Sequence, residues 1–111
     1  MSEEEQQFGV LLKRLIKEAG LTQEAFYKEA GITKPYFYNI LKGSPPPPVQ
    51  QRKFMELLQP SPGDAQRFYD LSARLRNELP ADIQLAVAAS PSLVGSIRSL
   101  IETMKEEHDH E

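Results

Sequence analysis

Two consecutive helical patterns, each only about two turns long, constrain this chain more than any other feature. Thr22 and Thr33 stand where helix N-caps are expected, and Gly31 and Gly43 interrupt the patterns that follow them. Helices this short are not stable alone, so other helices must frame the pair. The tight turn at Gly31 sets the second helix across the first and leaves its outer face exposed. The sequence therefore predicts two crossed helices over about 22–41.

The segments on both sides of this pair also have helical periodicity. An amphipathic pattern from Phe8 to Ala19 ends at Gly20, and no segment shows the alternation of a β-strand. Further helices are expected after the pair, at about 49–58, 64–79, 81–89 and 92–105. The sequence predicts an all-α fold, with five helices up to about residue 79 and a C-terminal extension of two short helices.

A run of prolines separates the short pair from the next helix. Ser44 to Pro48 contains four consecutive prolines, which cannot enter a helix interior and favour an extended backbone. Such a segment can be a stiff loop or a ligand for proline-recognising domains. We expect the stiff loop.

Charge is distributed unevenly along the chain. The formal net charge is −3, and the acidic charge sits at both ends of the chain: residues 6–59 carry eight basic and four acidic side chains, whereas residues 1–5 carry three acidic ones and residues 60–111 carry five basic and nine acidic ones. A mildly basic N-terminal half fits a surface that meets an anionic partner, and the acidic half fits a part that stays away from it. Chance unevenness is the alternative interpretation.

Composition excludes several classes of protein. The chain has no cysteine, which removes disulfides, thiolate nucleophiles and thiolate metal sites. No apolar run approaches the roughly 20 residues that cross a bilayer, and the acidic N-terminus is unlike a signal peptide. We expect a soluble, cytoplasmic protein.

Motifs of catalysis are missing from the sequence. The chain has no Gly-rich phosphate loop, no HExxH and no serine-nucleophile elbow. Its two histidines, His108 and His110, stand beside Asp109 and Glu111, where a metal site is the alternative to a solvated, flexible tail over 106–111. We expect the tail, and therefore no enzymatic activity, no metal and no cofactor.

The stretch FGVLLKRLIKEAGLTQEAFYKEAGITKPYFYNILKG, residues 8–43, resembles the Cro and phage-repressor type helix-turn-helix proteins, the Xre family. The resembling elements are Phe8-Gly9 with Leu12 and Leu15, Gly20-Leu21-Thr22-Gln23, Ala30-Gly31-Ile32-Thr33, and Ile40 with Gly43. The resemblance implies a five-helix, lambda-repressor-like DNA-binding domain over 6–79. It also implies a sequence-specific transcriptional regulator, with repression as the expected mode.

The resemblance further implies which residues meet DNA. Gln23 matches a position at which the family hydrogen-bonds a phosphate. The first two turns of the recognition helix, which face base edges in the family, match Thr33, Lys34, Pro35, Tyr38 and Asn39. Lys42 and Ser44 follow that helix and can reach the DNA backbone.

Individual side chains in this segment suit different contacts. Lys34 suits guanine O6 and N7 or a phosphate, and Asn39 suits adenine N6 and N7. Tyr38 suits a sugar or a thymine methyl, and Pro35 can make only apolar contacts. Among the neighbouring aromatic and apolar residues, we expect Phe37 and Ile40 to face the core and Tyr36 and Tyr38 to be exposed. Exposed aromatic rings suit a DNA groove, where we expect Tyr36 as well, or a protein partner.

The chain departs from the family pattern in three ways. Tyr27 stands in the middle of the first short helix, where the family has a small residue, so the ring must leave sideways or rearrange the contact. Ile16 and Leu41 replace an Arg–Glu ion pair, an exchange that costs little when both residues are apolar. Lys34 and Lys42 are the only cations of the recognition segment.

The C-terminal extension, residues 80–105, has a continuous apolar stripe. The stripe can fold back on the five-helix core or pair with its equivalent in a second chain. We expect a homodimer that binds a palindromic operator in double-stranded DNA, with dimer contacts from Leu93, Ile97, Leu100, Ile101 and Met104. The alternative function is a protein-interaction module, antitoxin-like or an adaptor.

Overall fold

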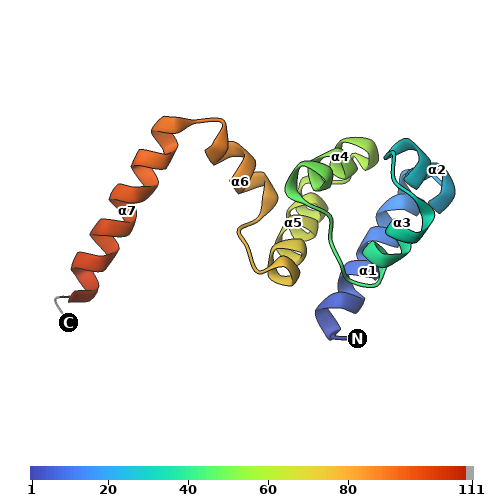
Figure 1. Ribbon diagram of the computed structural model, residues 1–111, viewed down its shortest axis with the longest axis horizontal. Helices are drawn as coiled ribbons and strands as arrows, with labels where there is room; N and C mark the ends of the chain where they lie inside the picture. Colours follow the sequence, from blue (N-terminus) through green and yellow to red (C-terminus); the bar gives the residue numbers. More distant parts are fainter. Residues whose placement is uncertain (110–111) are drawn as a thin grey trace.

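The computed structural model describes residues 1–109, and all regular secondary structure in this range is helical (Figure 1). The helices in chain order are α1 (Glu3–Glu18), α2 (Gln23–Glu29), α3 (Lys34–Leu41), α4 (Pro48–Leu58), α5 (Pro62–Arg76), α6 (Ala81–Ala88) and α7 (Pro91–Asp109). The all-α prediction of five helices followed by two is therefore confirmed.

Three helices have boundaries that differ clearly from the prediction. α1 begins at Glu3, five residues before the expected start, because Ser2 caps it. α5 begins at Pro62 because Ser61 caps it, and it ends early because Asn77 takes a left-handed conformation with φ of 54°. Leu79 therefore lies beyond the helix and is 63% exposed, instead of continuing its apolar face. α7 is longer than predicted: its helical backbone runs past Lys105 to Asp109, into the segment expected as the tail. His110 and Glu111 lie outside the described residues.

The starts of α2 and α3 and the turn between them follow from local chemistry. Thr22 and Thr33 accept hydrogen bonds at their side-chain oxygens from the backbone N–H groups of Ala25 and Tyr36. At the end of α2, Gly31 has φ of 73°, and Ile32 N–H donates to the Tyr27 carbonyl at 3.0 Å. This Schellman closure favours glycine, which takes the left-handed conformation without strain, and it produces the turn between α2 and α3.

All five phenylalanines of the chain lie fully buried in one core. Each of the first five helices contributes one of them: Phe8, Phe26, Phe37, Phe54 and Phe68. Phe26 and Phe54 meet edge to face with ring centroids 4.9 Å apart, and Phe8 and Phe68 lie 5.4 Å apart. The short helices α2 and α3 are thus anchored in the same core as the longer helices that frame them.

Gly9 lets α1 approach α3 closely. A Cβ built on Gly9 would overlap the backbone carbonyl oxygen of Leu41, which ends α3. Because that oxygen belongs to the backbone, it cannot rotate away as a side chain could. The contact therefore fixes how α3 sits on α1.

The proline run is a packed loop that leads into α4. Pro45 and Pro46 are buried, and Pro48 occupies the first turn of α4, where its missing N–H costs nothing. Gln51 Nε2 donates to the Pro46 carbonyl at 2.8 Å, and Arg76 Nη1 donates to the Pro45 carbonyl at 3.1 Å. Burial of these prolines supports the stiff-loop interpretation over a ligand for proline-recognising domains.

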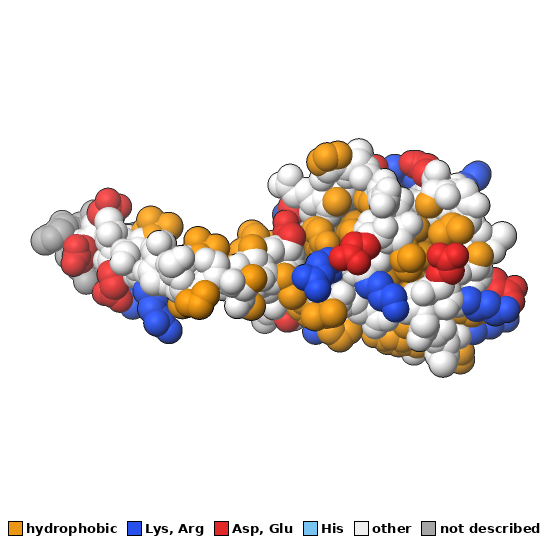
Figure 2. Space-filling model, turned by 90° about the horizontal axis from the view of Figure 1, so that it is seen from above, with side chains coloured by type: hydrophobic (Ala, Val, Ile, Leu, Met, Phe, Trp, Pro, Cys, Tyr) orange, Lys and Arg blue, Asp and Glu red, His pale blue; other side chains and the backbone are white. Residues whose placement is uncertain are grey.

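The last two helices form an arm on this core (Figures 1 and 2). α6 packs against α4 and α5, with Ala81 buried, whereas the main contact of α7 is with α6. The radius of gyration is 16.7 Å, against about 13 Å for a compact domain of this length. α7 therefore does not fold back on the five-helix core, and Figure 2 shows apolar side chains exposed along the arm.

Candidate nucleic-acid interface

The outer face of α3 carries most of the residues expected to meet DNA. Phe37 and Ile40 turn inward and are completely buried, which confirms their expected placement. The helical period then turns the residues between them outward. The exposed residues of this segment are Thr33, Lys34, Pro35, Tyr36, Tyr38, Asn39, Lys42 and Ser44. The expected exposure of Tyr36 and Tyr38 is confirmed as well.

Lys34 and Tyr38 form a pair on this face. The Lys34 ammonium lies 5.9 Å from the centre of the Tyr38 ring, one helical turn away. Tyr38 also meets Phe37 edge to face at 5.7 Å between ring centroids. These contacts hold the ring against the helix surface with a cation beside it, an arrangement that suits a sugar–phosphate backbone.

Gln23, Tyr38 and Lys42 meet in one hollow although they come from α2, α3 and the end of α3. The hollow has a volume of about 410 Å³ and lies where α1 crosses the other two helices. The residues that line it are Met1, Gln6, Gly9, Val10, Lys13, Gln23, Tyr38, Leu41 and Lys42. Within this described lining there are two lysines and no carboxylate, so the hollow suits an anionic partner.

Lys13 and Val10 are candidate contacts that the sequence analysis did not select. Both belong to α1, and Val10 is 68% exposed although it is apolar. They reach the hollow only because Gly9 lets α1 lie against the end of α3. The feature of the sequence that could have indicated these two contacts is Gly9. It precedes both residues on a helix whose other buried side chains are large and apolar.

Comparison with known proteins agrees with this geometry. The family described as Helix-turn-helix domain matches residues 7–79, about two thirds of the chain. The chain belongs to the helix-turn-helix domain family. No curated protein and no solved structure matches it.

Tyr27 is the first position at which the sequence was expected to depart from the family that it resembles. Its ring is partly buried at the edge of the core and packs on Phe37 with ring centroids 5.5 Å apart. Tyr27 thus takes part in the α2–α3 contact at its partly exposed edge, where it covers Phe37. The sequence had left open a ring that leaves sideways or a rearranged contact.

The second expected departure is the apolar pair Ile16 and Leu41, which the resemblance matches to an ion pair. Ile16 and Leu41 are both buried in the hydrophobic core of the helix-turn-helix domain. Neither therefore leaves a charge in need of a partner, as expected from the low cost of such an exchange.

Some lysines of the domain surface form ion pairs, and others line the hollow. Lys28 Nζ lies 2.8 Å from Glu24 Oε1 within α2. This hydrogen bond raises the pKa of Lys28 and lowers the pKa of Glu24. Glu24 therefore compensates part of the positive charge of Lys28, whereas Lys13 and Lys42 line the hollow.

The residues expected to form a dimer lie on the arm, away from α3 (Figure 1). Leu93, Leu100, Ile101 and Met104 are exposed on α7, and Ile97 is half-buried. Within residues 1–109 no helix is long and apolar enough to cross a membrane. The same residues contain no group of three or more His, Cys, Asp or Glu side chains that could hold a metal ion.

Proposed function

We propose that the protein is a sequence-specific transcriptional regulator of the Cro and phage-repressor type, which inserts α3 into the major groove of DNA. The observation that carries this proposal is the outer face of α3, exposed from Thr33 to Asn39 within a domain of the helix-turn-helix family. The major groove, about 12 Å wide, admits one helix presented in this way. Repression follows if the operator overlaps a promoter.

Roles within the proposed interface follow from side-chain chemistry. Asn39 reads adenine through its amide, and Lys34 reads guanine or meets a phosphate. Gln23, Lys42 and Ser44 hold the DNA backbone, and Lys13 of α1 joins them through the shared hollow. One short helix makes few base contacts, so a homodimer on a palindrome supplies the affinity that one domain lacks.

Selection of binding sites from random duplex DNA, followed by titration of variants, tests this function. Asn39→Ala removes one bidentate base contact and should cost about 1–3 kcal/mol at the selected site, with little change on unrelated duplexes. Gln23→Ala and Lys42→Ala should weaken binding to all duplexes alike. Arg98→Ala, which removes a cation from the arm, should change neither. Recovery of no enriched sequence would contradict the proposal.

A protein-interaction module is the second candidate function. The observation in its favour is the exposed apolar surface of the arm, which includes Ile83 of α6 and Leu100 of α7. In that case α7 holds a different protein and DNA contact is secondary. A stable complex with a heterologous protein, together with unselective DNA binding, would favour it over the regulator.

A further inference from the structure

The apolar stripe of α7 has the spacing of a coiled-coil seam. Leu93, Ile97, Leu100 and Met104 are separated by four, three and four residues, the alternation that keeps side chains along one line of contact between two helices. Leu100 is 60% exposed and Met104 is 58% exposed, while the main contact of α7 is with α6. The stripe is therefore available to another helix.

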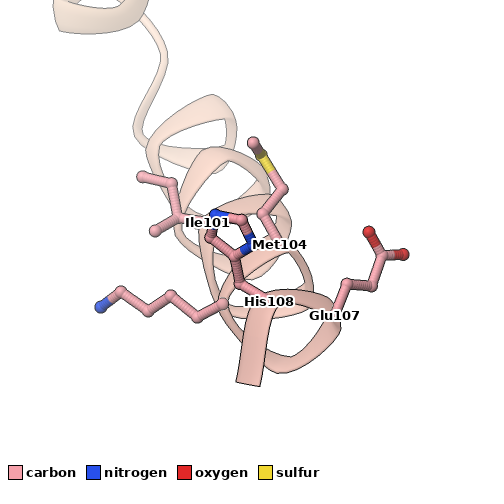
Figure 3. Close-up of a pocket in the computed structure, with 5 residues that line it drawn as sticks. Ile101, Met104, Glu107 and His108 are labelled. Atoms are coloured by element: carbon pink, nitrogen blue, oxygen red, sulfur yellow. The ribbon is translucent and has the colours of Figure 1, made fainter. Parts of the chain in front are cut away.

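A hollow borders this stripe at Met104. Its volume is about 460 Å³, and its lining includes Ile101, Met104, Lys105 and His108 (Figure 3). These positions follow the order i, i+3, i+4 and i+7, the four residues that surround one inserted side chain in knobs-into-holes packing. The hollow, which Glu107 also lines, is therefore a place where side chains of a helix laid along α7 can pack.

We infer that the occupant is the α7 helix of a second copy of this chain, laid antiparallel. The four–three–four spacing reads the same from both ends, so the stripe is complementary to itself when the second helix is reversed. In that register Leu93 faces the partner's Met104, and Ile97 faces the partner's Leu100. Leu93 is then the side chain that enters the hollow of the partner subunit.

The charges of α7 select the antiparallel direction over the parallel one. The first turn has no acidic residue, and Arg98 is the only charged side chain between residues 91 and 101. Glu102, Glu106 and Glu107 gather toward the other end. In the antiparallel register Glu106 lies beside the partner's Pro91, where the free N–H groups of a helix start favour an anion. A parallel pair would align these glutamates with their own copies.

The inference deepens the proposed homodimer and rests on it, but the pairing can be tested without DNA. The chain contains no cysteine, so single cysteines introduced on α7 report unambiguously. Leu93→Cys and Met104→Cys alter exposed positions away from the core, and the full-length chain should fold in both. Ser99→Cys, on the opposite face of α7, is the matched control.

The experiment is oxidation of each variant alone and of an equal mixture of the Leu93→Cys and Met104→Cys proteins, read by mass spectrometry. The mixture should give the mixed disulfide at several-fold higher yield than either self-linked dimer, and Ser99→Cys should give little. Self-linking of Met104→Cys as the main product would show a parallel pair and overturn the inference. Monomeric wild-type protein in sedimentation, with no cross-link, would overturn it as well. Mixed disulfide without DNA binding would keep the inference and remove only the proposed function.

Discussion

At Gly9, one missing Cβ lets α1 lie directly against the last turn of α3. The recognition segment therefore depends on a residue that touches no DNA in the proposed complex. Gly9 lines the same hollow as Gln23 and Lys42, so the approach of the helices and the shape of the interface are set together.

Gly9→Ala should destabilise the domain by about 1–3 kcal/mol, because the added methyl group overlaps a backbone oxygen and must push α1 from α3. Gly95→Ala is the matched control, since a Cβ at that position meets nothing within 4 Å. The control should be neutral or stabilising by up to about 1 kcal/mol through helix propensity. Urea denaturation of both variants measures the difference, and equal stabilities would contradict the described contact.

Residue-scale prediction from the sequence succeeded where chemistry is local. Thr22, Thr33 and Gly31 act within three or four residues of themselves, so their caps and turn could be read directly. The Ser2–Glu5 capping box at the start of α1 is equally local, but it was not recognised in the run of acidic residues. The packing of Tyr27 at the edge of the core could not be predicted, because it depends on Phe37, which lies in the next helix ten residues away.

Between elements, Arg14 ties α1 to α5. Its guanidinium donates to both carboxylate oxygens of Asp64, at 2.9 and 3.2 Å, and also to Glu18 at 2.7 Å. These hydrogen bonds raise the pKa of Arg14 and lower the pKa of Asp64. Arg14 and Asp64 are fifty residues apart in the sequence, so helical periodicity could not predict their ion pair. Because the ion pair is exposed to solvent, its contribution to stability is small.

The lowered pKa of Asp64 predicts the sign of a pH effect. Its contribution to folding is complete above the ordinary aspartate value of about 3.9 and is lost as the pH falls through the lower folded value, because the unfolded chain takes up the proton first. The free energy of unfolding should therefore fall more steeply below about pH 4 in wild type than in Asp64→Asn. Asp70→Asn, which changes another carboxylate of α5 outside this ion pair, should retain the wild-type slope. Identical slopes for wild type and Asp64→Asn in chemical denaturation at pH 3–5 would contradict this assignment.

At the scale of the whole molecule, the chain forms a five-helix core and an arm made of α6 and α7. α6 is apolar around most of its circumference, and it joins the core through α4 and α5. Periodicity found the helices of the arm but not whether α7 folds back, since an apolar stripe looks the same whether its cover comes from the same chain or another. The end of α5 at Asn77 likewise depends on a left-handed residue that the pattern through Leu79 concealed.

The separation of core and arm also separates the lysines near α3 from the glutamates of α7. Lys13, Lys34 and Lys42 lie on or beside the α3 face, whereas α7 carries Glu102, Glu106 and Glu107. A net charge of −3 is therefore compatible with DNA binding, because the acidic side chains of α7 are kept on the arm.

The most direct test of the proposed regulator is the salt dependence of its affinity for the selected duplex. The logarithm of the binding constant should fall linearly with the logarithm of salt concentration, by about 0.9 for each phosphate neutralised. Lys42→Ala should reduce that slope by about 1 per subunit, while Asn39→Ala and Arg98→Ala leave it unchanged. A slope near zero in wild type, or one that Lys42→Ala does not alter, would contradict DNA binding through this face.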